Sequence, residues 1–267
     1  MTLPLALLLS GKLKMLNYQI DGDRNLPTLI LSPSLGSTLE MWEPNLDILL
    51  KDFAVLRHDH LGHGKSSAPD HPYTLVEVGN ELLAITQKEE ISQFYFAGIS
   101  LGGLLGMWLG INAPEKVRGL ALFCTNSSFA PPQRWQERAT LARREGLTAI
   151  SEASLERWFT PTYLAQNADQ TEKIKGMIQS NSAIGYANNC ALLEQADLTN
   201  QLNLIECATL VVAGQSDPTL EVAQVERLSA LIPNSTFKVI EGASHLATFE
   251  QPEIACAMIS EQFLGRK

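Results

Sequence analysis

The sequence has few cysteines, and their spacing excludes the common metal and redox motifs. Four cysteines occur among 267 residues, at positions 124, 190, 207 and 256, and no pair has C-x-x-C or metal-ligand spacing. We interpret them as buried or scattered free thiols in a reducing cytosol. The pattern therefore predicts a cytoplasmic protein without a metal centre.

Positive charge is also scarce. Lys and Arg number 20 against 29 Asp and Glu, which gives a net charge of −9 at pH 7. A surface of this sign repels a phosphate backbone, so we expect no nucleic-acid partner. It gives no long-range attraction to an anionic substrate either, so such a substrate would need a local basic pocket.

No apolar run is long enough to cross a membrane, so we expect no membrane partner. Residues 3–9 resemble the apolar part of a short signal peptide, but they contain Pro4 and follow no basic segment. Residues 12–20 then read as a strand. A first hairpin explains this start better than an export signal does.

What the chain does contain is a regular alternation of apolar segments. Its 45% apolar and 18% charged residues exclude disorder and allow a large core. Helical stretches at 75–87, 101–112, 220–231 and 252–263 separate most of the candidate buried strands. These strands are expected at 28–32, 54–58, 94–97, 117–124, 209–213 and 236–240. The order predicts an α/β fold with a mostly parallel twisted sheet flanked by helices.

The alternation breaks between residues 130 and 200. This part has no convincing strand, opens at Pro131-Pro132, and contains helix-like stretches at 134–144 and 151–158. We interpret residues 130–200 as an inserted helical cap, with residues 1–129 and 201–267 forming the core. The cap should cover the carboxyl edge of the sheet, where ligands bind in open α/β sheets.

The most informative motif is Gly98-Ile99-Ser100-Leu101-Gly102, which reads G-x-S-x-G. An aromatic strand precedes it and an apolar helix follows it, so Ser100 lies where a strand turns sharply into a helix. This is the context of a nucleophile elbow, whereas the bare pattern would indicate only a turn. Glycines on both sides suit the close approach of strand and helix.

A serine hydroxyl needs a base to remove its proton, and a carboxylate to orient that base. In this fold the order is serine, acid, histidine. His245 is the only one of five histidines that follows Ser100, and it comes just after the last expected strand. Asp217 follows strand 209–213. Other carboxylates are open to simpler roles as surface groups or helix caps, namely Asp169, Asp197, Glu241 and Glu250.

An oxyanion needs two donors. One should be the N–H of Leu101, directly after the serine. The second should come from the loop after strand 28–32, where Leu35 is the candidate. Residues 59–66, Asp-His-Leu-Gly-His-Gly-Lys-Ser, could suggest a metal or base site, but we interpret them as a tight structural turn.

At this point the chain resembles the α/β-hydrolases, and within them the 3-oxoadipate enol-lactonases. Superfamily features include the elbow and Gly62-His63-Gly64, and the more specific match is the cap segment Arg157-Trp158-Phe159-Thr160-Pro161. Other matching segments are Ser34-Leu35-Gly36 with Met41-Trp42, residues 55–57, 108–115, 242–245 and 250–253. The resemblance implies a cofactor-independent serine hydrolase that opens a small anionic enol-lactone, a carboxylate-bearing substrate.

The cap offers a feature compatible with such a substrate. Five of the ten arginines lie there, at 134, 138, 143, 144 and 157. Arg134 and Arg138 share a helix face, and arginine suits carboxylate binding. We rank Arg138 first, with Arg134, Trp135 and Trp158 as further candidates. A solvated helix face for the arginines, and cap packing for the tryptophans, remain open.

Two other functions remain open from the sequence. The same serine, acid and histidine would serve an esterase, a carbon–carbon bond hydrolase or a perhydrolase. A hydrolase-like protein that binds a ligand with little turnover is a different class. The intact set Ser100, Asp217 and His245 favours an enzyme.

Overall fold

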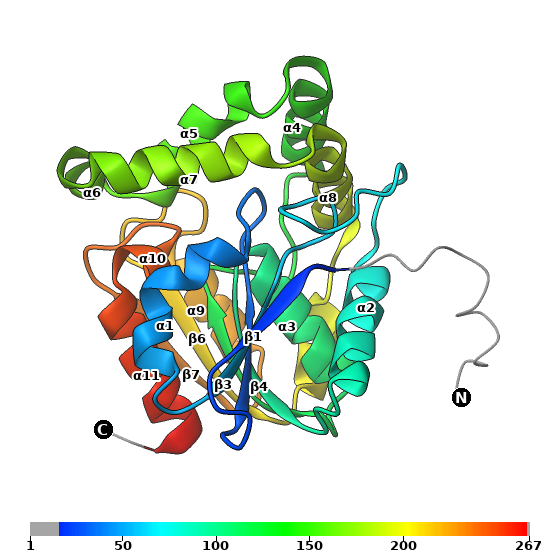
Figure 1. The fold of residues 1–267 in the computed structure, drawn as a ribbon, viewed down its shortest axis with the longest axis vertical. Coiled ribbons are helices and arrows are strands. Elements are labelled where there is room, and N and C mark those ends of the chain that lie inside the picture. Colours follow the sequence, from blue (N-terminus) through cyan, green and yellow to red (C-terminus); the bar gives the residue numbers. More distant parts are fainter. Residues whose placement is uncertain (1–15, 266–267) are drawn as a thin grey trace.

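The structure, a computed structural model, describes residues 16–265. It contains a seven-stranded sheet with the order β1-β3-β2-β4-β5-β6-β7 (Figure 1). Only β1 runs antiparallel to its neighbour, and every other pair is parallel. The strands are β1 (Tyr18–Asp21), β2 (Thr28–Ser32), β3 (Ala54–His58), β4 (Phe94–Ile99), β5 (Val117–Phe123), β6 (Ala208–Gly214) and β7 (Ser235–Ile240).

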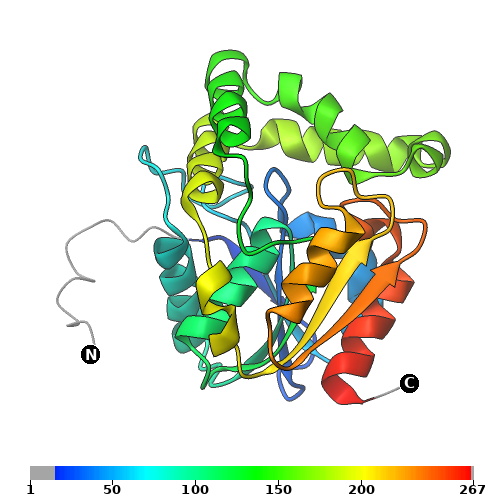
Figure 2. The ribbon, with the colours of Figure 1, turned by 180° about the vertical axis from the view of Figure 1, so that it is seen from behind.

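Helices cover both faces of the sheet. Helices α1 (Glu43–Leu49) and α11 (Pro252–Leu264) pack against each other on one face (Figures 1 and 2). Helices α2 (Leu75–Lys88) and α3 (Leu101–Asn112) pack against each other on the other face. Helix α9 (Val222–Ala230) lies on this second face and packs on β6 and β7. The remaining helical elements outside the cap are η2 (Leu39–Trp42), η3 (Thr199–Leu204) and α10 (Ala247–Glu250). The predicted mostly parallel sheet flanked by helices is therefore confirmed.

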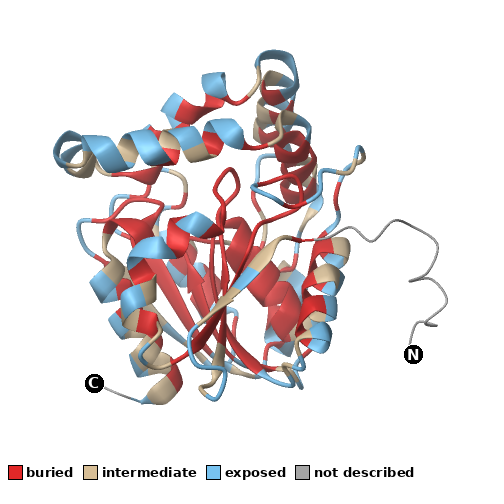
Figure 3. Cartoon of the chain, in the orientation of Figure 1, coloured by how far each residue is buried: buried red, intermediate tan, exposed pale blue. Residues whose placement is uncertain are grey.

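Strand β4 shows why the central strands read as continuous apolar runs. All six of its residues are buried, and successive side chains point to opposite faces. The ring of Tyr95 stacks on Phe263 of α11 with centroids 4.5 Å apart. Phe96, on the other face, lies so close to α3 that a Cβ at Gly106 would come within 2.8 Å of its ring. Figure 3 shows the resulting buried sheet between partly exposed helices.

Six of the predicted strands and the four core helices are found within two residues of their expected bounds. Of the strand expected at residues 12–20, the described residues form a strand only from Tyr18, as β1. Strand β4 ends at Ile99 instead of residue 97. Helix α9 begins at Val222 instead of residue 220. The reason is local, because the Leu220 N–H donates to the Asp217 carboxylate and is committed to that turn. Glu221 then forms the N-cap, in a capping box with Gln224.

Five helices lie between β5 and β6 in the chain and across one end of the sheet (Figures 1 and 2). They are α4 (Pro132–Glu145), α5 (Thr148–Trp158), α6 (Pro161–Gln166), α7 (Ala168–Ser180) and α8 (Ala183–Gln195). Helix α4 packs on α8, and α5 on α7.

The two ends of this helical segment meet at its base. Ser128 and Asp197 form a β-bridge, and the Leu198 N–H donates to the Ser127 carbonyl at 3.0 Å. A segment whose ends meet at the core has the form of an insertion. This supports the proposed cap at residues 130–200, which we retain as a proposal.

The first arm of the predicted hairpin, residues 3–9, lies outside the described residues, as does the start of the second arm. Within the described part, that second arm is represented by β1, which pairs with β3. No helix between residues 16 and 265 combines the length and the apolar character needed to cross a membrane.

Candidate active site

Ser100 occupies the sharp turn between β4 and α3. Its backbone has φ 57° and ψ −115°, a conformation that non-glycine residues rarely adopt. Neighbouring groups hold it there: the Ser100 N–H donates to the Phe123 carbonyl at 3.0 Å, and its carbonyl accepts from the Thr125 hydroxyl at 2.7 Å. Hydrogen bonds from β5 and the loop after it therefore hold Ser100 in this strained backbone conformation.

The two motif glycines are required by close approach. A Cβ at Gly98 would lie 2.3 Å from the Gly102 carbonyl oxygen, and a Cβ at Gly102 would lie 2.3 Å from the Ser32 carbonyl oxygen. Real Cβ contacts are never this short, so any side chain would push the strand and the helix apart. The interpretation of the motif as an elbow is consistent with this geometry.

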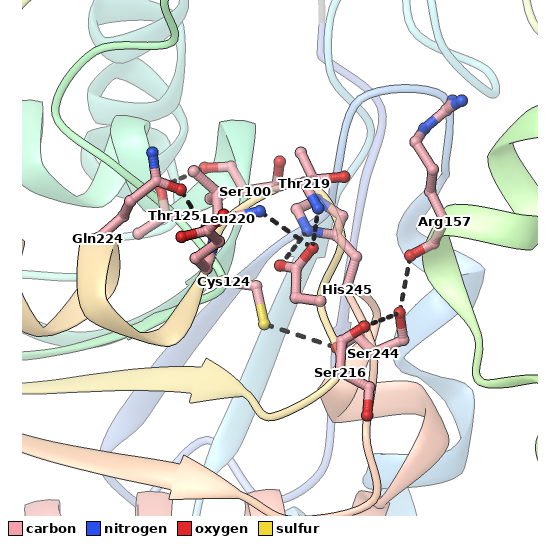
Figure 4. Close-up of polar contacts among 12 residues, drawn as sticks. Ser100, Cys124, Thr125, Arg157, Ser216, Thr219, Leu220, Gln224, Ser244 and His245 are labelled. Carbon is pink, nitrogen blue, oxygen red and sulfur yellow. Dashed lines mark hydrogen bonds and ion pairs between the residues drawn. The ribbon is translucent and has the colours of Figure 1, made fainter.

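Asp217 and His245 come from the loops after β6 and β7 and meet at the same edge of the sheet. Figure 4 shows His245 beside Thr219 and Leu220 of the first of these loops. The Asp217 Oδ2 atom lies 2.7 Å from His245 Nδ1, and both residues are buried. Asp217 Oδ1 accepts from the backbone N–H groups of Thr219 at 2.7 Å and Leu220 at 3.2 Å. One oxygen thus fixes the carboxylate, and the other is directed at the imidazole.

The His245 loop is attached to the end of α5. The Ser244 hydroxyl donates to the Arg157 carbonyl at 2.8 Å (Figure 4), and the Leu246 N–H donates to the Trp158 carbonyl at 3.0 Å. Because these bonds use backbone groups of the cap, a shift of α5 would be transmitted to the imidazole.

Glu250 adds a third link between this loop and the cap. Its Oε2 accepts from the Ser244 N–H at 2.7 Å, and its Oε1 accepts from the N–H and the hydroxyl of Thr160. The carboxylate is buried and its oxygens are occupied by these donors. This arrangement favours a supporting role over that of the acid that orients His245.

The other carboxylates considered lie away from His245. Asp197 accepts from the Thr199 N–H at 2.9 Å, and its hydrogen bonds to Thr199 lower the pKa of its carboxyl. Asp169 lies in the first turn of α7, and Glu241 is exposed after β7. These positions suit helix and turn capping.

A cavity lies between the sheet edge and the cap, and both Ser100 and His245 line it. Its volume is about 20 Å³, so a lactone ring can enter only if lining side chains move apart. A larger cleft of about 350 Å³ lies beside Tyr73 and Trp108, but no nucleophile and base meet there. The other residues that line the active-site cavity are Ser34, Leu35, Phe129, Trp135, Arg138, Arg157, Trp158 and Thr219.

Four of the predicted oxyanion-hole and substrate residues therefore line the cavity, namely Leu35, Trp135, Arg138 and Trp158. Arg134 is not among the lining residues, but its guanidinium carbon lies 5.6 Å from the centre of the Trp135 ring. Arg157, which sequence reasoning did not rank, does line it. The sequence signal that could have pointed to Arg157 is its position in segment 157–161, which carries the more specific part of the resemblance.

The arginines around the cavity form a cluster without counter-ions. Arg138 lies 5.1 Å from the ring centre of Trp135 and donates to the Tyr186 hydroxyl. Burial, with the nearby Arg138 charge, lowers the pKa of Arg157 to about 10 and also lowers the pKa of Arg134. Within residues 16–265 none of the three forms an ion pair with a carboxylate.

Such a cluster is costly while it is unpaired, because like charges that are partly buried repel one another and lose hydration. A bound anion would relieve both costs. The remaining two cap arginines have other partners: Arg143 donates to Asn188, and Arg144 pairs with Glu145 on the surface. The five arginines therefore fall into two groups. The charges of Arg134, Arg138 and Arg157 lie near one another, whereas Arg143 and Arg144 interact with other residues.

The two amides predicted to hold an oxyanion follow β2 and β4. Leu101 is the first residue of α3, where backbone N–H groups have no acceptor within the helix. Leu35 lines the cavity in the loop after β2. Neither N–H donates to another group in the described chain, so both remain candidates.

Three buried histidines support the loop that carries Leu35. His58 Nε2 lies 3.0 Å from the Ser32 hydroxyl, and His60 Nε2 lies 2.8 Å from the Pro33 carbonyl oxygen. The Gly36 N–H donates to His63 Nε2 at 2.9 Å. Residues 59–66 therefore form a structural turn, and no group of three or more His, Cys, Asp or Glu in residues 16–265 is arranged to bind a metal.

We expect this histidine cluster to make the protein sensitive to acid. Burial lowers the pKa of His58 and of His63 to about 4 and lowers that of His60 as well. Between pH 6.5 and 4 the unfolded chain binds protons that the folded chain excludes, so stability present above pH 6.5 is lost as the pH falls. The loss is about 1 kcal/mol per pH unit for each histidine. Urea unfolding at pH 7.5, 6.0 and 5.0 measures it, and equal stabilities at these values would contradict it.

The four cysteines are free thiols, as the sequence predicts. Cys124, Cys190 and Cys256 are buried and Cys207 is partly buried. Burial raises the pKa of Cys190 to about 12 and that of Cys256 to about 11, so neither forms a thiolate near neutral pH. The cysteines therefore supply no second nucleophile.

Comparison with known proteins agrees with this geometry. Residues 27–252 match the model of the alpha/beta hydrolase fold family. The chain is 39% identical to 3-oxoadipate enol-lactonase 2 of Acinetobacter baylyi, over 89% of both chains, and 32% identical to 3-oxoadipate enol-lactonase 1 of the same organism, over 90% of both.

A solved structure is similar over nearly the whole chain. The enol-lactonase from Burkholderia xenovorans LB400 superposes with a TM-score of 0.91 at 34% identity, covering 94% of this chain and 96% of that one. The fold, the elbow and the extent of these matches lead to one conclusion. This chain belongs to the α/β-hydrolase fold family.

Proposed function

We propose that the protein is a serine hydrolase that opens a small anionic enol-lactone, converting 3-oxoadipate enol-lactone to 3-oxoadipate. The observation that carries the proposal is the cluster of Arg134, Arg138 and Arg157 beside a cavity that contains Ser100 and His245. A neutral substrate would leave these charges unpaired. The similarity to two 3-oxoadipate enol-lactonases supports the same substrate class.

The first half of the reaction forms an acyl-enzyme. Ser100 Oγ attacks the lactone carbonyl carbon, and His245 Nε2 takes the hydroxyl proton. Asp217, on the other ring nitrogen, stabilises the resulting imidazolium. The amides of Leu35 and Leu101 hold the oxyanion of the tetrahedral intermediate. The ring C–O bond then breaks, and His245 protonates the departing enol oxygen.

In the second half, water hydrolyses the acyl-enzyme. The leaving group stays attached because a ring has opened, so it can exit only when the ester to Ser100 is cleaved. His245 takes a proton from water, the hydroxide attacks the acyl carbon, and Ser100 leaves with that proton. The released enol becomes the ketone, and the product carries two carboxylates.

The arginine cluster supplies the affinity in this proposal. A carboxylate is best held by guanidinium groups, which can donate two parallel hydrogen bonds. Arg138 and Arg157 line the cavity with Trp135 and Trp158, so the charged end of the substrate would lie among these side chains. The place of the reaction in aromatic-acid breakdown, which the resemblance to the 3-oxoadipate enol-lactonases implies, belongs to the same proposal.

Replacement of Arg138 by alanine should raise the KM for the enol-lactone acid about tenfold or more, because a buried carboxylate loses a charged partner. Hydrolysis of a small neutral ester, p-nitrophenyl acetate, should change little. Steady-state kinetics on both substrates separates a lost anion site from a general defect.

Arg144→Ala is the matched control, since Arg144 is exposed and paired with Glu145. It should leave both substrates unaffected. Equal losses on the acid and the ester in Arg138→Ala would assign Arg138 a structural role through Tyr186. No loss on either would remove the reason to expect an acidic substrate at this position.

A further inference from the structure

The loop that carries Leu35 closes on itself in a tight turn. The Ser37 N–H donates to the Ser34 carbonyl at 3.1 Å, and Gly36 has φ +90°. A turn with this bond and a positive φ at its third residue is of type II, which differs from type I mainly in the orientation of the central peptide. That peptide contains the Leu35 carbonyl and the Gly36 N–H, whereas the Leu35 N–H belongs to the preceding peptide of the same turn. The position of the Leu35 N–H therefore depends on the whole turn being held in place.

His63 holds this central peptide. The Gly36 N–H donates to His63 Nε2 at 2.9 Å, so Nε2 must be unprotonated. His63 Nδ1 lies 3.2 Å from the Leu61 carbonyl and donates to it. Both bonds need the neutral ring in one tautomer, and burial favours the neutral form.

Asn181, at the end of α7, holds the next peptide from the other side. Its Nδ2 donates to the Gly36 carbonyl at 2.8 Å, and its Oδ1 accepts from the Gly64 N–H at 2.7 Å. Gly36 is thus hydrogen-bonded on both sides: its N–H bonds to His63 in the loop after β3, and its carbonyl bonds to Asn181 at the end of α7. His63 is fully buried and is not among the residues that line the cavity.

We propose that His63 is a positioning residue for the oxyanion hole, acting through the Gly36 peptide on the Leu35 N–H. The inference rests on serine-based acyl transfer in the proposed function, but not on the identity of the lactone. Loss of the imidazole acceptor would leave the buried Gly36 N–H without a partner. The turn would shift to satisfy that donor and would carry Leu35, with its N–H, out of position. Misplacement by about 1 Å can cost up to 10²-fold in rate.

The test compares His63→Leu, which removes the acceptor, with His63→Gln, whose amide oxygen can accept from Gly36. With p-nitrophenyl acetate we expect kcat to fall about ten- to 100-fold in the leucine variant, with KM within about twofold. The glutamine variant should recover most of kcat. His71, which is partly exposed and lies near Glu77, is the matched control, and its replacement by leucine should keep full activity.

A boronic acid gives an independent readout, because its anionic tetrahedral adduct with Ser100 uses the same donors. Its inhibition constant should rise in His63→Leu by the factor by which kcat falls. Active sites are counted with a fluorophosphonate, so that unfolded protein does not enter kcat. Should the leucine variant fail to fold, Asn181→Asp, which removes the donor to the Gly36 carbonyl, should lower kcat several-fold at unchanged KM.

Certain outcomes would overturn the proposal. Full kcat per titrated site in His63→Leu, or a glutamine variant as slow as the leucine variant, would show that the Gly36 bond does not matter for turnover. A wild-type protein that hydrolyses the ester but not the lactone would instead refute the substrate assignment, and the His63 test would still stand.

Discussion

Replacing Ser100 with alanine should lower kcat by about 10⁴-fold or more while the fold stays intact. In the proposed mechanism the Ser100 hydroxyl oxygen forms the acyl-enzyme, and no cysteine near it offers a replacement nucleophile. Alanine adds no bulk at the elbow, so the contacts of the Ser100 backbone with Phe123 and Thr125 can persist. Hydrolysis of the enol-lactone and of p-nitrophenyl acetate measures the loss.

A matched control is Ser229→Ala, which removes a buried hydroxyl that bonds to Ser235. Ser235 begins β7, so this bond lies at the opposite end of the strands from Ser100. This variant should keep its activity and its labelling by a fluorophosphonate, whereas Ser100→Ala should lose both. Circular dichroism and urea unfolding establish that each variant is folded. Near-normal turnover by folded Ser100→Ala would rule out the serine mechanism.

Replacing Asp217 with asparagine should lower kcat by about 10⁴-fold. The amide oxygen would keep the bonds from Thr219 and Leu220, so the amide NH₂ would face His245 Nδ1. His245 would then accept at Nδ1 and carry its proton on Nε2, the nitrogen that must take the proton of Ser100. The geometry would survive with the wrong tautomer.

Asp197→Asn and Asp169→Asn are the controls for this change, since each removes one carboxylate from the cap segment. Asp197 caps a turn through Thr199, so its replacement should affect stability modestly and turnover little. If Asp197→Asn were the damaging variant and Asp217→Asn were active, the acid would have to be reassigned to the segment before β6.

The same loop that carries His245 also defines one wall of the cavity. Ser244 and Leu246 donate to the carbonyls of Arg157 and Trp158 at the end of α5. Glu250 accepts from the N–H of Thr160, two residues further on. If the proposed substrate binds at these residues, a movement of Arg157 or Trp158 on binding would be transmitted through these bonds to the loop of the imidazole. Rigid support of this kind suits a site whose groups must keep their geometry within a fraction of an ångström.

Most of the fold could be predicted from the sequence because local patterns determine it. A strand buried on both faces must be apolar along its length, as β4 is, and it reads as a short continuous run. The elbow is equally local, since a strand, a small-residue turn and a helix follow one another within the chain. His245 and Asp217 could be predicted as candidates because parallel strands end at a common edge.

The tertiary structure decided what depends on contacts between distant segments. Spacing along α4 indicates that Arg134 and Arg138 share a face, but only packing brings Arg157 from α5 to the cavity that Arg138 lines. Packing also leaves the three without carboxylate partners in the described chain. In the same way, residues 59–66 read as a turn, and the bond from Gly36 to His63, 27 residues apart, became visible only in the folded chain. Sequence periodicity specifies which side of an element is buried, whereas the partner across the interface is set by how the elements pack.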